Sequence, residues 1–537
     1  MKRELVALTL IVLVSSLLSL SLLSRDHLWG DDFAAYIMQA RSILTGSEQD
    51  FVQHNAFSIS QSSRRFAPAA YPWGFPLLLT PTYAAFGLNP LALKLTNVVH
   101  FTLFLIVFFF YLRIRLPWVP AAILLGVLAF NPSLLLAQDE ILSDLPFLFF
   151  ATLSIYLIDR YLWQRPRPPG LLGQIGIGFA IFFTYFVRIH GFVLIGVVFA
   201  LNALRGGRSL RRIAQEIGQD TAIYATFALL FVLDRAVTPG GEATYWAQVG
   251  SFTMGGLLDN ARYYILLPEA FFDMLPGRTL LFELIGLLFC IGVAHRFKRE
   301  TPAVLFVIAS LGLLMVYPIR AGLRYIYPLL PFFVSVAYTG GRKLLPSRRD
   351  IQGWYSALWS GLPVVSLIIS IPFAGFLGGP RPPINGPFDE LSTEMFSYIR
   401  TSTPADALIV FFKARAMRLF TDRNSIMLTE CERLGEGNYI VINREIGEVN
   451  QVAPDRIENC NSQLRLRKVF QNRRFTVYEV QASAAGAVLR SNGSRPEQST
   501  SFTAQSSRSC LDHIQSCDAR SRPYFGRDSS RTRCHPG

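Results

Sequence analysis

Residues 4–24 read ELVALTLIVLVSSLLSLSLLS, and residues 25–33 continue as RDHLWGDDF. A predominantly apolar run of this length is enough to cross the hydrocarbon core of a bilayer as a helix. Lys2 and Arg3 precede the run, and no small-residue cleavage site of the A-x-A type follows it, so we interpret it as an uncleaved membrane anchor. The acidic pair Asp31-Asp32 then lies just beyond the end of this first span.

Similar apolar runs recur between short basic loops along the first part of the chain. The predicted membrane spans are 4–24, 91–112, 117–136, 144–163, 171–187, 189–204, 219–237, 279–295, 302–317, 322–338 and 354–376. They predict a polytopic α-helical membrane protein with about eleven transmembrane helices. The composition agrees, because 51% of the 537 residues are hydrophobic and only 16% are charged. The spans 171–187 and 189–204 are short, and a single re-entrant pair is the alternative there.

The net charge of +14 does not require a nucleic-acid partner, because its position explains much of it. Basic residues follow Lys2 and Arg3 in every second loop: Arg113 and Arg115; Arg160, Arg165 and Arg167; Arg205, Arg208, Arg211 and Arg212; Arg296, Lys298 and Arg299; Arg342, Lys343, Arg348 and Arg349. Basic loops face the cytoplasm. The segments 25–90, 238–278 and the chain after about residue 378 are therefore expected outside the cytoplasmic (inner) membrane.

A Gly/Pro-rich linker at 378–387 separates the spans from a second domain. We expect helices at 388–401 and 413–420, and strands at 407–412, 439–442, 466–470 and 475–480. The predicted organisation is a transmembrane domain over 1–380 with the outer loop 25–90, an extracytoplasmic α/β domain over 381–482, and a disordered tail over 483–537. Cys431 and Cys460 could form a disulfide in an oxidising compartment.

The acidic pair opens a predicted helix in the first outer loop. Apolar residues of the segment 32–44 fall on one helical face: Phe33, Ile37, Ala40 and Leu44. Gly46 is expected to end this amphipathic helix, which could lie on the membrane surface. The simple structural interpretation is that Asp31 caps the helix and Asp32 favours its dipole. The segment 76–87 is too short to span easily and is expected to be re-entrant or interfacial.

Further motifs follow on the predicted outer side. They are Tyr71-Pro72-Trp73-Gly74-Phe75-Pro76, Ser143-Asp144-Leu145-Pro146, Arg188-Ile189-His190-Gly191, Arg324-Tyr325-Ile326-Tyr327-Pro328 with Pro331, Lys413-Ala414-Arg415, and Thr421-Asp422-Arg423. With the acidic pair, this order of motifs resembles the GT-C superfamily over residues 25 to 430. Within it, the chain is most similar to bacterial membrane glycosyltransferases akin to the lipid A aminoarabinose transferase and to the protein O-mannosyltransferases.

Three motifs depart from the family pattern. The pair Asp31-Asp32 stands where the family has Asp-Glu, and the turn at 71–76 replaces Tyr-Pro-Pro-x-Tyr-Pro. The element at 421–423 lacks the family's glycine. The resemblance implies a loop helix region and an outer domain around a site on the extracytoplasmic side.

By this resemblance the protein is an inverting glycosyltransferase that uses a polyprenyl-phosphate sugar donor and a lipid, glycan or protein acceptor. The implied catalytic residues are Asp31, Asp32 and Asp144, and the implied substrate-binding residues are Tyr71, Arg188, His190, Arg324, Tyr325, Lys413 and Arg415. A carboxylate suits the removal of a proton from an acceptor hydroxyl, and Asp31 is our first choice. A leaving phosphate needs cations, which Arg188, Arg320 and Arg324 supply at the outer ends of spans. Alternatively, Arg188 and Arg324 snorkel to outer lipid headgroups.

A divalent metal is the one cofactor that we consider. Asp139, Glu140 and Asp144 form a second acidic cluster, and oxygen ligands from Asp32, Asp144 and Glu140 could hold such an ion. The chain has no Walker loop and no Gly-x-Gly-x-x-Gly after a strand, which disfavours nucleotide-sugar or ATP use. The histidines show no His-x-x-x-His or similar spacing, so the sequence does not predict a structural zinc site.

Two other function classes compete with this prediction. A secondary transporter or lipid flippase would explain the spans and buried charges. It would not explain the acidic loop helix, the odd number of spans or the outer domain, and we find no internal repeat of the kind common in transporters. A scaffolding subunit is the third class, and replacement of Asp31 would leave its function intact.

Overall fold

The computed structural model describes residues 2–64, 67–164, 169–240, 253–346, 348–373, 384–457, 459–462 and 464–481. The tail predicted to be disordered and most of the predicted linker lie outside these residues. The helices of the membrane region are α1 (Lys2–Leu22), α2 (Asp32–Thr45), α3 (Glu48–Gln61), α4 (Gly74–Phe86), α5 (Pro90–Arg113), α6 (Trp118–Ala129), α7 (Pro132–Leu136), α8 (Asp144–Leu157), α9 (Leu171–Val187), α10 (Val193–Gly206), α11 (Leu210–Gln219), α12 (Thr221–Val237), α14 (Met254–Leu266), α15 (Arg278–Val316), α16 (Leu330–Leu344) and α17 (Arg349–Phe373).

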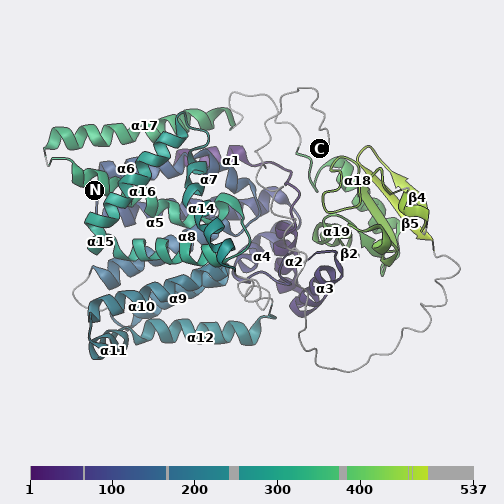
Figure 1. Cartoon of the computed structure of the whole chain (residues 1–537), viewed down its shortest axis with the longest axis horizontal. Coiled ribbons are helices and arrows are strands. Elements are labelled where there is room, and N and C mark those ends of the chain that lie inside the picture. Colours follow the sequence, from purple (N-terminus) through teal and green to yellow (C-terminus); the bar gives the residue numbers. More distant parts are fainter. Residues whose placement is uncertain are drawn as a thin grey trace. The chain divides into compact units, whose positions relative to one another are not determined.

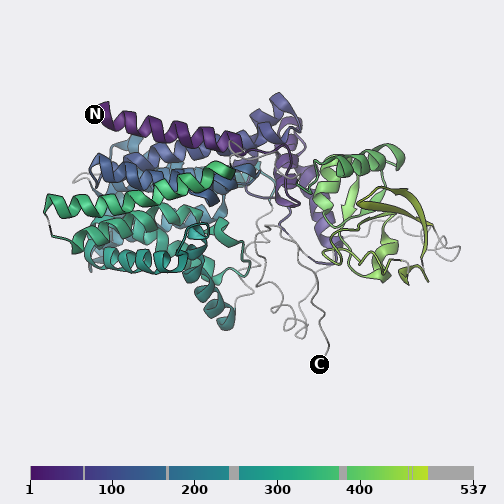
Figure 2. The ribbon, with the colours of Figure 1, turned by 90° about the horizontal axis from the view of Figure 1, so that it is seen from above.

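The long helices run alongside one another and share one apolar core (Figures 1 and 2). Among the described residues, six helical segments are long and apolar enough to cross a membrane, or seven if the bent pair α6 and α7 is one span. The protein is therefore a multi-pass membrane protein. This number is below our prediction of about eleven because α9 and α12 have only 17 residues each and α16 has 15.

Helix α15 covers two of the predicted spans, 279–295 and 302–317, as one element of 39 residues. Arg278 at its start donates to Asp273 (2.6 Å), and Met315 near its end accepts from Asn260 of α14 (3.1 Å). A straight helix of this length would extend about 58 Å, too far for both ends to meet the same neighbouring segment. The element therefore bends back on itself, and Pro302, which lacks a backbone donor, lies within it.

Local chemistry explains where several helices begin and end. The Asn89 side chain accepts from Ala92 N (3.2 Å), and Pro90 occupies the first turn of α5, where no backbone donor is needed. In the same way, Asn131 accepts from the first turn of α7, and Pro132 follows it. This cap interrupts the predicted span 117–136, so that it bends by 54° between α6 and α7.

The first outer loop contains three helices, of which α3 was not predicted. Helix α2 ends at Gly46 as expected, with a left-handed φ of 64°. It is enclosed on most sides and packs against α4 and a helix of the C-terminal domain, so most of its faces contact protein. The residues off its apolar face are buried because they find polar partners: Gln39 bonds the backbone of Tyr71, and Tyr36 bonds Ser143.

The C-terminal domain is the predicted small α/β unit. It contains α18 (Glu390–Ser402), β1 (Leu408–Val410), α19 (Ala414–Thr421), β2 (Asn424–Ile426), β3 (Tyr439–Asn443), β4 (Arg465–Gln471) and β5 (Phe475–Gln481). The strands form one mixed sheet in the order β2-β1-β3-β5-β4, parallel among β2, β1 and β3 and antiparallel among β3, β5 and β4. Cys431 and Cys460 are joined by a disulfide, the pairing that the sequence allowed.

Candidate active site

Asp31 precedes α2, but its side chain makes no capping hydrogen bond to that helix. Its Oδ2 lies 3.8 Å from Nζ of Lys413, and its Oδ1 has no hydrogen-bond partner among the described residues. Burial raises the pKa of the Asp31 carboxyl, and the positive charges of Lys413 and Arg415 offset part of this rise. The side chain is thus a buried carboxylate with an unused acceptor oxygen, and the capping interpretation does not describe it.

Asp32 faces different partners. Its Oδ1 accepts a hydrogen bond from the Tyr71 hydroxyl (2.6 Å), and its Oδ2 lies 3.5 Å from Nη2 of Arg324. The Asp32 side chain is 36% exposed, against 12% for Asp31. Asp32 is therefore the open member of the pair, and Asp31 is the enclosed one.

Asp144 begins α8 and is held by two arginines from distant parts of the chain. Its Oδ1 accepts from Nη1 of Arg188, and its Oδ2 accepts from Nε of Arg324 at 3.0 Å. Arg324 consequently bridges Asp32 and Asp144. The Asp144 side chain is only 5% exposed, whereas Arg324 retains 32%. Arg324 is thus the cation of this group that stays accessible to a ligand.

Two glycines of the motifs allow the backbone to approach closely at this place. A Cβ on Gly191 would lie 2.5 Å from backbone atoms of Thr184 and Tyr185, so only glycine lets the turn after Arg188 fold back onto the end of α9. A Cβ on Gly74 would lie 2.5 Å from the backbone of Phe186. The glycines of Arg-x-x-Gly and of the turn at 71–76 therefore bring Arg188 and Tyr71 to the same end of α9.

Arg415 joins the C-terminal domain to the outer loop. Its Nε donates to Asn55 (2.9 Å), Nη1 donates to the Tyr71 hydroxyl (3.3 Å), and Nη2 donates to the Pro68 carbonyl. Its guanidinium also lies 5.2 Å from the centre of the Tyr71 ring, and the side chain is buried. Of the two predicted basic residues of this domain, Lys413 faces the acidic pair, and Arg415 anchors the loop.

The remaining predicted binding residues lie around Arg188. Its guanidinium stands 5.3 Å from the centre of the Tyr325 ring and 5.9 Å from that of Phe147. His190 packs on Phe147 at 5.6 Å, and its Nε2 has no hydrogen-bond partner among the described residues. Arg320, by contrast, donates to Asn260 of α14 (2.8 Å) and does not join this group.

Glu140 lies next to His27, and burial lowers the pKa of His27 to about 4, so the imidazole is neutral near pH 7 and the two groups are not an ion pair. Oε2 of Glu140 lies 3.1 Å from Nε2 of His27, and burial raises the pKa of Glu140 to about 7. The proposed ligands Asp32 and Asp144 are each already bound to Arg324. In the part of the chain that the structure describes, no three His, Cys, Asp or Glu side chains are grouped as a metal site requires. This donor set does not fit a divalent ion, and we derive no step through one.

Several residues of this region were missed by the sequence analysis. Lys94 is fully buried and binds Asp139 (2.8 Å), which also accepts from Ser24. Trp29, two residues before the acidic pair, packs against Phe412 of the C-terminal domain, with ring centres 5.0 Å apart. Lys94 could have been found, since an ionisable residue inside an apolar run is a functional candidate by default. Trp29 carried no comparable signal.

Comparison with known proteins shows what the fold is similar to. No protein-family model matches the chain, and no curated protein matches it in sequence. The crystal structure of ArnT from Cupriavidus metallidurans in the apo state matches with a TM-score of 0.57 at 14% identity, over 88% of this chain and 97% of that chain. The same protein bound to undecaprenyl phosphate matches with a TM-score of 0.56, also at 14% identity and over the same shares.

A second kind of enzyme has a similar structure. The oligosaccharyltransferase from Archaeoglobus fulgidus in the apo form matches with a TM-score of 0.54 at 13% identity, over 82% of this chain and 70% of that chain. Both matches extend over most of this chain. The resemblance predicted from the motifs is thus confirmed at the level of fold: the chain is a multi-pass membrane protein whose fold is similar to those of ArnT and of the archaeal oligosaccharyltransferase.

Proposed function

We propose that the protein is an inverting glycosyltransferase that moves a sugar from a polyprenyl-phosphate carrier to an acceptor on the outer face of the cytoplasmic membrane. One observation carries the proposal: the carboxylates of the acidic pair and of Asp144 lie together with Arg324 and Lys413, at ion-pair distances of 3.0–3.8 Å. The fold accommodates such a carrier in ArnT, which has been crystallised with undecaprenyl phosphate.

The arginines are suited to the leaving group. A polyprenyl phosphate leaves with negative charge on its phosphate oxygens, and fixed cations in a partly enclosed site stabilise that charge. Arg324 is the more accessible of the two arginines, and Arg188 stands behind it on the other oxygen of Asp144. We place the carrier phosphate against the exposed side of Arg324, with Asp144 holding both guanidinium groups in position.

Asp31 is suited to accept the proton of the acceptor hydroxyl. In the proposed reaction an acceptor hydroxyl gives its proton to the Asp31 carboxylate while its oxygen forms a bond to the anomeric carbon. The bond from that carbon to the phosphate oxygen breaks, and its electron pair stays on the phosphate. Attack on the face opposite the leaving group inverts the anomeric centre. A raised pKa makes Asp31 a stronger base than a solvated aspartate, and its free Oδ1 can accept the proton.

We also propose eleven crossings, with the C-terminal domain on the outer side of the cytoplasmic membrane. The three shorter helices α9, α12 and α16, and the second arm of α15, complete the count beyond the seven segments found by length and composition. The alternation of basic loops supports this orientation. The disulfide between Cys431 and Cys460 supports it too, because such bonds persist in oxidising compartments.

The experiment is a transfer assay with the full chain in proteoliposomes. The donors are undecaprenyl-phosphate-linked glucose, mannose and arabinose, and the acceptors are extracted envelope lipids and glycans. We expect enzyme-dependent release of undecaprenyl phosphate and a product of inverted configuration with at least one donor. A retained anomeric configuration would overturn the mechanism. Transmembrane movement of the carrier without release of its sugar would favour the flippase class.

A further inference from the structure

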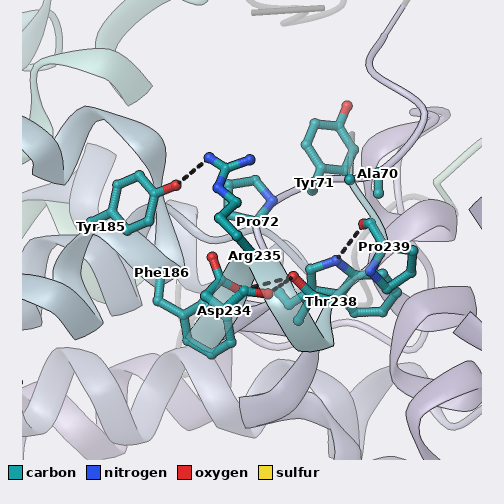
Figure 3. A pocket seen from close by; sticks show the side chains of 11 residues that line it. Ala70, Tyr71, Pro72, Tyr185, Phe186, Asp234, Arg235, Thr238 and Pro239 are labelled. Carbon is teal, nitrogen blue, oxygen red and sulfur yellow. Dashed lines mark hydrogen bonds between the residues drawn. The ribbon is translucent and has the colours of Figure 1, made fainter. Parts of the chain in front are cut away.

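A cavity of about 250 Å³ is lined in part by Tyr71, the residue that contacts Asp32 of the acidic pair (Figure 3). Its walls come from the loop between α3 and α4, from the end of α9 and from the last turn of α12. The lining residues that matter here are Tyr71, Trp73, Tyr185, Asp234, Arg235 and Thr238. Among the described residues that line it, none is a cation assigned above to the carrier phosphate. The cavity is therefore separate from the proposed phosphate site and is connected through Tyr71 to the proposed catalytic carboxylates.

Two neighbouring residues of α12 give the cavity its polar character. Oδ1 of Asp234 accepts a hydrogen bond from the Thr238 hydroxyl (2.9 Å), and Nη2 of Arg235 donates to the Tyr185 hydroxyl (2.9 Å). Figure 3 shows both side chains in the same wall, with Tyr185 on one side and Thr238 on the other. A carboxylate and a guanidinium from neighbouring positions of α12 thus both line the cavity, each held by its own partner.

This pair suits a neutral ligand with many hydroxyl groups. A hydroxyl both donates and accepts, so one ligand can bond the carboxylate and the guanidinium together. A phosphate can use only the guanidinium, and the adjacent carboxylate of Asp234 would repel it. The aromatic side chains of the other walls offer apolar surface for the C–H groups of a sugar ring. The volume lies below the roughly 300–1,000 Å³ of clefts that take drug-sized ligands, which fits a single sugar residue.

Tyr71 links this cavity to the acidic pair. Its side chain lines the cavity, and its hydroxyl donates to Oδ1 of Asp32 (2.6 Å). Trp73, two residues further along the same loop, donates to the Pro239 carbonyl (3.3 Å), which holds the end of α12 against the loop. A ligand in the cavity is therefore one side chain away from the carboxylates.

We propose that the cavity binds a sugar residue of the acceptor, so that the substrate to be modified is a free glycan or the headgroup of a glycolipid. The assignment to the acceptor rests on the proposed function, because the carrier phosphate occupies Arg324 there. The binding of a sugar by Asp234 and Arg235 does not depend on catalysis and is tested without it.

The test is saturation-transfer NMR on the full chain in nanodiscs, since detergents with sugar headgroups would compete. The probes are methyl glycosides of glucose, galactose, mannose and arabinose, with the matching octyl glycosides as a second arm. We expect contacts to at least one methyl glycoside, and a loss of affinity of about tenfold or more in Asp234→Asn and in Arg235→Gln. Stronger binding of the octyl form would indicate a glycolipid, and equal binding a free glycan.

Matched controls are available on α14, where Asp259 and Arg262 are both exposed. Asp259→Asn and Arg262→Gln should leave glycoside binding unchanged. Thr238→Val removes one hydroxyl only and serves if a charge substitution prevents folding; it should weaken the same contacts. No contact with any glycoside in the wild-type protein, or contacts that persist in all three cavity variants, would refute the proposal.

A carrier site in the same cavity would give a different result. If Arg235→Gln weakens the binding of undecaprenyl phosphate and leaves the glycosides untouched, the cavity belongs to the donor and the inference is wrong. If the protein transfers no sugar but the cavity variants still lose glycoside binding, the proposed reaction fails and the sugar site stands.

Discussion

Lys413 of the C-terminal domain places its Nζ 3.8 Å from Oδ2 of Asp31, at the start of the first outer helix. Nearly the whole membrane region separates these two residues in the sequence. Trp29 packs on Phe412 beside them, so the C-terminal domain and the outer loop meet at the acidic pair. The domain therefore completes the candidate site and is more than an appendage to the membrane helices.

Asp31→Asn is the sharpest test of the proposed base. Asparagine keeps the size of the side chain and removes its basicity, and the wild-type side chain makes no capping bond that could be lost. We expect a normal thermal unfolding temperature and a loss of transfer rate on the order of 10²-fold or more. Asp32→Asn should reduce the transfer rate by a smaller factor. Wild-type transfer by Asp31→Asn would move the role of base to Asp32 or Asp144.

Arg324→Ala tests the phosphate site, with Arg320→Ala as its matched control. Both arginines are close in sequence, but Arg320 bonds Asn260 and lies outside the carboxylate group. Charge-assisted contacts to phosphate contribute about 1.5–3 kcal/mol. Arg324→Ala should therefore weaken undecaprenyl phosphate binding about ten- to a hundredfold, as measured by titration in nanodiscs, while Arg320→Ala should bind normally. Equal affinities in the two variants would assign Arg324 to lipid headgroups.

Gly191→Ala tests the close approach behind Arg188. The added Cβ would lie 2.5 Å from the backbone of α9, which must then shift. Overpacking of this kind costs about 1–3 kcal/mol, so we expect a lower unfolding temperature and weaker binding of undecaprenyl phosphate. Gly196→Ala is the control, because nothing lies within 4 Å of a Cβ there. If both variants behave alike, the turn tolerates the change and this explanation of the motif is wrong.

Glu140 predicts a pH dependence of stability. Its pKa is about 7 in the folded protein, above the ordinary value of 4.5, because burial disfavours the charged form. The folded state thus binds the proton more tightly than the unfolded state, and stability from this group is full below about pH 4.5 and is lost as the pH rises through 7. Glu140→Gln removes this pH dependence of stability. As the pH rises from 5 to 8, the unfolding temperature of the variant minus that of the wild type should therefore increase. A constant difference across this range would contradict the assignment.

A reporter fusion tests the orientation. A fluorescent protein that matures only in the cytoplasm, fused after residue 480, should remain dark, and the same protein fused before residue 2 should fluoresce. Because every second loop is basic, a bright fusion after 480 would reverse all the loops together and would remove the argument for an outer donor.

Much of the membrane region follows from the sequence because apolar length alone predicts a span. Helices α1, α5, α9 and α17 lie close to their predicted ranges. The bend at Asn131-Pro132 was not predicted, since the hydropathy of a segment carries no information on its direction. The two spans within α15 were predicted with a basic loop between them, and the structure instead joins them as one continuous helical element. The strand β2 was missed because only one of its three residues, Ile426, is apolar, whereas the equally short β1 consists of apolar residues. Helix α2 is buried on more sides than its amphipathic pattern predicted, because that pattern identifies the apolar side of a helix and not how many of its sides contact protein.

The sequence by itself determined the membrane class, the GT-C resemblance and the residue types of the site. The length of the apolar runs, the charge of the loops and the spacing of the motifs are local properties of the chain, so they can be read without a structure. Only the tertiary structure decided which side chains meet. It joined Arg324 to both Asp32 and Asp144, turned Arg415 into an anchor for the loop, and placed Glu140 next to His27. These choices depend on contacts between segments more than a hundred residues apart, and such contacts are set by distances in space that no local pattern encodes.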